Sequence, residues 1–307
     1  MLQAPGLSRS HAPVLVTGAT GNVGRAVVNS LVDAGVVVHA LVTAPDEARS
    51  NADRVSPLLS FVAFDFKRPM TFGAAFADGT SLFLMRPPAI RHALVITQAL
   101  DAAYRSGVRQ VVFLSVQGAE RNPLIPHHAV EKHLQAMAST DPAFRYTMLR
   151  AAFFMQNLST THAADIRERS EILVPAGDGR TAFVDARDVG AAAARVLAGD
   201  SRDRFMNRAY ELTGREALTY HEVAAILSSA CGRKIRYRRP GLLRFYRAMR
   251  RRGHTRGFVT VMMALYSTAR IGLAAHLSPD LEMLLGYPPR TLVQFAREHV
   301  VAFMPVR

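Results

Sequence analysis

Three glycines near the start of the chain have the spacing of a phosphate-binding loop. Gly18, Gly21 and Gly24 follow the short apolar run of residues 14–16 and precede a stretch with helical spacing of apolar residues. Glycines let phosphates approach the backbone, and the first N–H groups of a helix attract an anion. The order strand, loop, helix, strand therefore predicts that the loop holds the diphosphate of a dinucleotide. The predicted contacts are with Gly18, Thr20, Gly21, Asn22, Val23 and Gly24.

The residue that would distinguish NAD from NADP is ambiguous. At the end of the second predicted strand, Asp or Glu usually binds a free ribose 2′-hydroxyl, whereas Arg or Lys binds a 2′-phosphate. This chain has Thr43 there, although Arg25 and Arg49 could reach a 2′-phosphate. The sequence thus predicts NADP or NAD and slightly favours NADP. Asp65, directly after the third predicted strand and followed by Phe66, is placed to accept a hydrogen bond from the adenine amino group.

Ser115, His128 and Lys132 repeat the spacing of a known proton-transfer arrangement. Ordinary short-chain dehydrogenases use Ser, then Tyr about thirteen residues later, then Lys four residues further on, and the Tyr protonates a carbonyl oxygen as hydride arrives. Here a histidine stands in place of the tyrosine, and His128 and Lys132 would share one helix face. A histidine titrates closer to neutral pH than a tyrosine, so His128 could donate the proton. The alternative is that His127 and His128 merely begin a helix behind Pro126.

Alternating strands and helices must position these residues. Strands are predicted at residues 14–16, 36–42, 60–64, 81–85, 111–114 and 145–150, and helices at 22–34, 90–106 and 128–138. This alternation predicts an α/β fold, a Rossmann-type doubly wound parallel sheet, over residues 13–157 after a flexible leader at 1–12.

The remaining residues, 158–307, predict a smaller, mostly helical substrate lobe interleaved with the last strands of the sheet. Its strands are expected at 172–174, 182–185 and 209–213, and its helices at 188–198 and 219–230. Thr219 and Glu222 have the spacing of a capping box at the start of the last of these helices.

Composition excludes several classes of protein. Among 307 residues, 49% are apolar, which suffices for a sizeable core, and the single cysteine excludes a disulfide framework or a cysteine-based metal cluster. The histidines lack metal-ligand spacing, so no metal is expected. No apolar run reaches the roughly 18 residues of a membrane span. A cytoplasmic protein without a membrane partner is expected.

The net charge of +14 is concentrated in one segment of the chain. Residues 233–256 contain eleven basic residues and no acidic one. This distribution favours a solvated basic face, or a surface for an acidic partner, over a nucleic-acid site, whose cations must track phosphates.

Several segments also resemble the NmrA-like family of atypical short-chain dehydrogenases. They are VTGATGNVG at 16–24, FLMRPP at 83–88, LSVQGAE at 114–120, YTMLR at 146–150 and FMQN at 154–157. The resemblance implies that an NAD(P) cofactor lies across residues 18–24 and contacts Thr43, Asp65, Phe66, Met85, Arg86, Pro87, Ser115 and Val116. It places the substrate towards Phe154 and Asn157. It also places His127 or His128 at the cofactor and Lys132 beyond the site.

Fold and resemblance together predict an NAD(P)H-dependent oxidoreductase that transfers hydride to a small organic acceptor such as a quinone, enone, ketone or imine. Two alternatives stay open. One is a regulator that binds NAD(P) and senses its redox state without turnover, a role that the missing tyrosine favours. The other is an isomerase, cyclase or dehydratase of a biosynthetic pathway that uses His127 or His128 as acid or base. A monomer or homodimer is expected.

Overall fold

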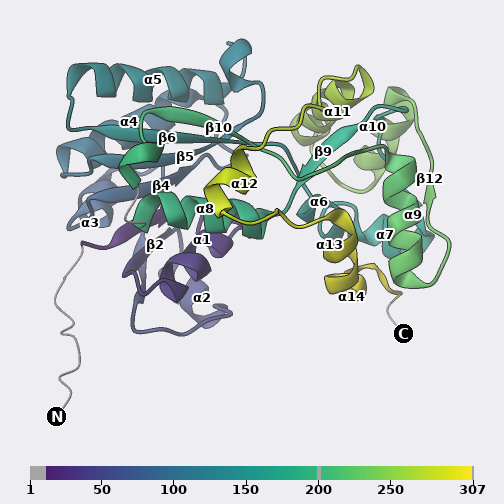
Figure 1. The fold of residues 1–307 in the computed structure, drawn as a ribbon, viewed down its shortest axis with the longest axis horizontal. Coiled ribbons are helices and arrows are strands. Elements are labelled where there is room, and N and C mark those ends of the chain that lie inside the picture. The colour runs from purple at the N-terminus through teal and green to yellow at the C-terminus, as the bar shows by residue number, and fades with distance from the viewer. Residues whose placement is uncertain (1–11, 199–201, 306–307) are drawn as a thin grey trace. The chain divides into compact units, whose positions relative to one another are not determined.

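The computed structural model describes residues 12–198 and 202–305, so the predicted leader lies almost wholly outside the described residues. The chain forms two compact units (Figure 1). The first comprises the described residues of Met1–Leu149 together with Gly190–Ala209, and the second comprises those of Arg150–Val189 and Tyr210–Arg307.

A seven-stranded sheet forms the centre of the first unit, in the order β10-β6-β5-β4-β1-β2-β3. The strands are β1 (Val14–Thr17), β2 (Val38–Val42), β3 (Leu59–Ala63), β4 (Ser81–Met85), β5 (Gln110–Val116), β6 (Arg145–Ala151) and β10 (Arg208–Leu212). β1 pairs in parallel with both β2 and β4, and β2 with β3 and β4 with β5 are also parallel. The strands of this centre are nearly continuous apolar runs because helices cover both faces. The predicted Rossmann-type sheet is confirmed.

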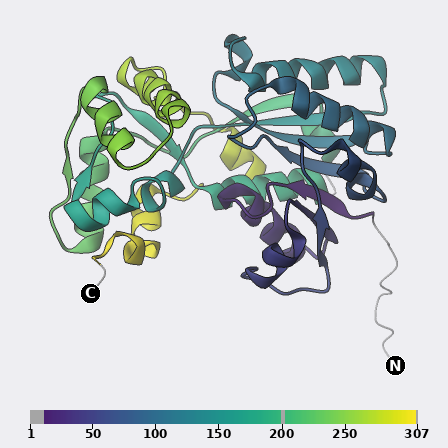
Figure 2. The same cartoon turned by 180° about the vertical axis from the view of Figure 1, so that it is seen from behind.

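Two layers of helices cover the sheet (Figures 1 and 2). One layer holds α3 (Phe72–Phe76), α4 (Ala93–Arg105) and α5 (Pro126–Thr140), and the other holds α1 (Asn22–Asp33) and α8 (Ala186–Ala198). Phe76, Leu100 and Leu134 of the first layer share one buried cluster with Phe113 of β5. In the second layer a Cβ on Gly190 would stand 2.6 Å from the carbonyl carbon of Ala26, so α8 lies directly against α1. The short α2 (Pro45–Ser50) follows β2.

Most predicted boundaries differ from the structure by one to three residues, as three examples show. The helix predicted from residue 90 begins at Ala93, because the chain first makes a turn in which the Ile90 amide donates to the Pro87 carbonyl at 3.0 Å. The strand predicted from residue 36 begins at Val38, because the Val36 amide still donates to Leu31 at the end of α1. The strand predicted at 172–174 is β8 (Glu171–Ile172).

The second unit is mostly helical, as predicted, around two small sheets. One contains β7 (Phe153–Phe154), β9 (Thr181–Val184) and β11 (Ala217–Leu218), and the other pairs β8 with β12 (Arg236–Tyr237). Its helices are α6 (Gln156–Ser159), α7 (Ala163–Arg169), α9 (Tyr220–Cys231), α10 (Leu242–Arg251), α11 (Arg256–Arg270), α12 (Asp280–Leu285), α13 (Leu292–Glu298) and α14 (Val300–Phe303). Large aromatic side chains fill its core, among them Tyr220, Phe245, Tyr266 and Phe295. The predicted capping box of Thr219 and Glu222 is present at the start of α9.

The basic segment runs from the end of α9 into the start of α11. In α10, Phe245 and Met249 are buried, whereas Arg244 and Arg247 are exposed. α10 is therefore an amphipathic helix whose apolar side belongs to the core of the second unit, whereas Arg233, earlier in the segment, donates to the Ile166 and Phe303 carbonyls at 2.6 and 2.7 Å. None of the described helices is long and apolar enough to cross a membrane.

Candidate functional site

The glycine loop, residues 18–24, is built so that only glycine fits at its critical positions. Gly18 has φ +63°, and a Cβ there would stand 2.1 Å from Cε of Met85. A Cβ on Gly24 would stand 2.1 Å from the carbonyl oxygen of Gly18, which is backbone and has no rotamer to yield. The Gly21 amide closes the turn by donating to the Gly18 carbonyl at 2.9 Å. No side chain of the described residues caps α1, so its first N–H groups stay available to an anion.

Thr17 joins the loop to the end of the neighbouring strand. Its hydroxyl accepts a hydrogen bond from the Met85 amide at 2.8 Å and donates to the Phe83 carbonyl at 3.2 Å. This pair of bonds fixes the end of β4 beside β1, so that Met85 lies against the glycine loop. Arg86 and Pro87 leave the sheet at the same edge. The sequence interpretation overlooked Thr17, although a polar residue at the end of an apolar strand, next to glycine, is the signal that identifies it.

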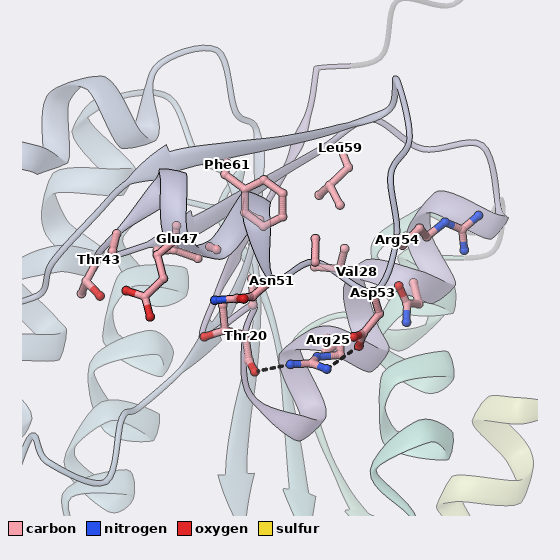
Figure 3. Close-up of a pocket in the computed structure, with 17 residues that line it drawn as sticks. Thr20, Arg25, Val28, Thr43, Glu47, Asn51, Asp53, Arg54, Leu59 and Phe61 are labelled. Carbon is pink, nitrogen blue, oxygen red and sulfur yellow. Dashed lines mark hydrogen bonds and ion pairs between the residues drawn. The ribbon is translucent and has the colours of Figure 1, made fainter.

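A cavity of about 270 Å³ opens beside the glycine loop, on the α1 side of the sheet (Figure 3). Thr20, Arg25 and Thr43 line it together, so the structure brings these three residues to one place. The Arg25 guanidinium forms an ion pair with Asp53, and its Nη2 donates to the Thr20 carbonyl at 3.3 Å. Arg49 is not among the residues that line this cavity; its Nη1 lies 3.4 Å from the Asp46 carboxylate.

Asp65 and Phe66 are engaged in local structure after β3. One carboxylate oxygen of Asp65 accepts a hydrogen bond from the Lys67 amide at 2.9 Å, and the Asp65 amide donates to the Thr71 hydroxyl at 3.1 Å. Phe66 is buried and packs edge to face on Phe64, with ring centroids 4.7 Å apart. Their predicted contact with adenine stays a prediction.

Ser115 is buried near the end of β5, and its hydroxyl is hydrogen-bonded to a residue that the sequence interpretation did not identify. Its hydroxyl donates to the Glu131 carboxylate at 2.6 Å, and the two residues are 0% and 3% exposed. Glu131 stands on the buried side of α5 beside Val130 and Leu134. An acidic residue inside an apolar stripe is the sequence signal for such a partner, since a buried carboxylate needs hydrogen-bond donors.

The two candidate histidines at the start of α5 have different environments. His127 Nε2 lies 3.5 Å from Nε of Arg86, and burial together with the Arg86 charge lowers the pKa of His127 to about 4. The ring of His127 is therefore neutral at neutral pH. His128 Nδ1 lies 2.9 Å from the Ala119 carbonyl, so this nitrogen donates and Nε2 is the ring nitrogen that this bond leaves open. Lys132 is exposed on the same helix.

The remaining predicted residues are distributed as follows. Val116 ends β5, Asn22 and Val23 begin α1, and Phe154 and Asn157 belong to β7 and α6 of the second unit. Within the described ranges, no three histidine, cysteine, aspartate or glutamate residues come together as a metal site.

Known proteins resemble this chain over nearly its whole length. The NAD(P)H azoreductase of Xenophilus azovorans is 32% identical over 292 residues, which are 94% of this chain and 99% of that protein. The structure of Citrobacter sp. triphenylmethane reductase complexed with NADP(H) aligns with a TM-score of 0.78 at 26% identity, over 92% of this chain and 99% of that one. The NADPH-dependent quinone oxidoreductase of Escherichia coli complexed with NADPH aligns with a TM-score of 0.80 at 25% identity, over 94% and 99%. The model of the NmrA-like family matches residues 10–249, and the chain therefore belongs to the NmrA-like family.

Proposed function

We propose that this chain is an NAD(P)H-dependent oxidoreductase that reduces a small organic acceptor. The glycine loop carries the proposal: without side chains at Gly18 and Gly24 the loop closes tightly over the start of α1, where the first N–H groups stay available to a diphosphate. When bound, the nicotinamide supplies hydride from its C4 carbon, and the protein supplies binding and orientation.

The acceptor is proposed to be a flat, conjugated molecule with a reducible carbonyl or imine, such as a quinone. The names of the similar proteins support this class, since an azoreductase, a triphenylmethane reductase and a quinone oxidoreductase all reduce conjugated groups. Hydride addition to a quinone leaves a negative oxygen, so one proton must follow.

His128 is the proposed source of that proton. Its Nδ1 is tied to the Ala119 carbonyl, which orients the ring and leaves Nε2 to carry the transferable proton. His127 is a poorer donor because its pKa of about 4 keeps it neutral. Ser115, whose hydroxyl is bound to Glu131, is proposed to fix the start of α5 to β5 rather than to touch substrate.

The test is a turnover assay with purified protein, NADPH or NADH, and a panel of quinones, enones, azo dyes and triphenylmethane dyes. His128→Phe is expected to lower kcat by about 100-fold or more at unchanged cofactor affinity, which is the usual size of an acid-base contribution. His133→Phe is the matched control, because His133 lies on the same helix and pairs with Asp101 at 2.7 Å.

Lys132→Met separates two arrangements of the site. An unchanged rate fits its exposed position, whereas a loss equal to that of His128→Phe would mean that serine, histidine and lysine act together.

Tight cofactor binding without turnover of any acceptor would contradict the enzymatic proposal and favour a redox-sensing regulator. The cytoplasmic location and the monomeric or homodimeric state stay predictions.

A further inference from the structure

The cavity beside the glycine loop is lined by opposing charges. Arg25 and Arg54 contribute the cations, and Glu47 and Asp53 contribute the anions. Arg54 pairs with Asp33 of α1 at 2.6 Å, whereas Arg25 donates to the Thr20 carbonyl of the glycine loop at 3.3 Å. Arg25 is therefore the cation beside the loop that a cofactor phosphate could engage. Figure 3 shows Arg25 and Asp53 pointing towards each other, with Thr43 and Glu47 across the cavity.

The position of the cavity matches the place where a ribose would be bound. Thr43 directly follows β2, which is where Rossmann proteins carry the acidic or basic side chain that contacts the ribose 2′ position. Thr43 has no charge, so charged residues from neighbouring elements must take over this discrimination. Arg25 comes from the first turn of α1, and Glu47 comes from the first turn of α2, four residues after Thr43.

We infer that Asp53 determines the choice between NADPH and NADH, because its carboxylate competes with the 2′-phosphate of NADPH for the Arg25 guanidinium. The inference rests on the proposed binding of NAD(P)H and adds the residue pair that sets its specificity. The side chains of Arg25 and Asp53 are 48% and 62% exposed. An ion pair so exposed to water is weak, and a phosphate with up to two charges can replace the carboxylate on the guanidinium. Glu47 adds repulsion towards the phosphate from the opposite side of the cavity.

Arg49, the alternative residue for binding the 2′-phosphate, is less well placed to do so. It belongs to the same short helix as Glu47, but it does not line the cavity and lies beside Asp46. Asp46 therefore provides a matched control for Asp53. Both are exposed aspartates near an arginine, and Asp46 is likewise not among the residues that line the cavity.

The experiment measures the dissociation constants of NADPH and NADH by fluorescence titration of the full chain. Asp53→Asn is expected to tighten NADPH binding by about three- to tenfold and to change NADH binding by less than about twofold, because only NADPH has the competing phosphate. Arg25→Met is expected to weaken NADPH binding by about tenfold or more, with little effect on NADH. Asp46→Asn is expected to change neither. The gain from Asp53→Asn is also expected to shrink as salt screens the charges.

The outcomes separate this inference from the proposed function. If the unmodified protein binds neither NADPH nor NADH, the proposed function is wrong and the inference with it. If both dinucleotides bind and Asp53→Asn changes them equally, or no more than Asp46→Asn does, the inference alone is wrong. It is also wrong if Arg49→Met abolishes the preference while Arg25→Met does not. Melting temperatures of the variants verify that the substitutions leave the fold intact.

Discussion

Gly24 is the residue at which the glycine loop tolerates least change. A Cβ added at Gly24 would lie 2.1 Å from the carbonyl oxygen of Gly18 and 3.0 Å from the Cα of Ala19. Both are backbone atoms. Gly24→Ala must therefore move the loop away from α1, which misaligns the N–H groups that a diphosphate needs. We expect dinucleotide affinity to fall by about 100-fold or more, since each lost charge-assisted hydrogen bond costs about 1.5–3 kcal/mol.

Gly73→Ala is the control for this substitution. Gly73 is also helical, and nothing lies within 4 Å of the Cβ it would gain. Titration with NADPH and NADH should show unchanged binding for this variant. Unchanged binding for Gly24→Ala as well would contradict the role given to the loop.

Glu131 offers a second prediction for a single residue. Glu131→Ala removes the acceptor of the buried Ser115 hydroxyl and leaves a space in α5, so we expect the first unit to lose about 1–3 kcal/mol of unfolding free energy. Ser115→Ala and the double variant complete a cycle measured by urea unfolding. Because the two side chains share one hydrogen bond, the double variant should cost less than the sum of the single variants, and additive costs would contradict the coupling.

The α9 helix carries a prediction for a whole element. Thr219 accepts a hydrogen bond from the Glu222 amide at 3.2 Å, and the Glu222 carboxylate accepts one from the Thr219 amide at 2.7 Å. The bond from the Thr219 amide to the Glu222 carboxylate, followed by one from the Thr219 hydroxyl at 2.9 Å, lowers the pKa of Glu222 below its ordinary value. Thr219→Ala should destabilise the second unit by about 1 kcal/mol, the usual cost of losing such a cap. The measurement is chemical denaturation.

Thr260→Ala is the comparison within another helix. Its exposed hydroxyl donates to the Arg256 carbonyl of its own helix, and alanine is the better helix former, so this variant should be neutral or slightly stabilising. If both variants lost the same unfolding free energy, the capping box of α9 would not stabilise the protein more than an ordinary threonine in a helix does.

The sequence predicted elements well where their periodicity is long and their ends carry a signal. The central strands, α1 and the capped α9 belong to this group, and their apolar spacing follows directly from burial in a covered sheet or on one helix face. The sequence did not predict α2, α6 and α7, because a helix of four to seven residues has too few turns to show a helical spacing of apolar residues.

The candidate site was predictable to different degrees for the same physical reasons. The glycine loop depends on neighbours in sequence, so its pattern is visible in the chain. The Arg25–Asp53 and Ser115–Glu131 pairs join residues 28 and 16 positions apart, and spacing alone does not bring such residues together. Only the folded chain shows that Arg25 already has a partner in the cavity.

For the molecule as a whole, the buried His162 and the half-buried His127 predict how stability depends on pH. His162 in the second unit is 1% exposed, its Nε2 is bonded to the Tyr266 hydroxyl, and burial lowers its pKa to about 4, with Arg252 and His254 acting in the same direction. His127 in the first unit also has a pKa of about 4. Both lie below the value of about 6.5 expected in the unfolded chain.

Between pH 6.5 and 4 the unfolded chain therefore binds more protons at these two positions than the folded chain does. Unfolding free energy should then fall as the pH is lowered through this window, by up to about 3 kcal/mol for His162 and less for the partly exposed His127. Urea unfolding at a series of pH values measures this slope. His162→Phe and His127→Phe should each flatten it relative to the unmodified protein, even where the substitution lowers stability at pH 7, because the carboxyl groups contribute equally in both proteins. A slope unchanged by either substitution would show that these histidines do not stay neutral when the chain is folded.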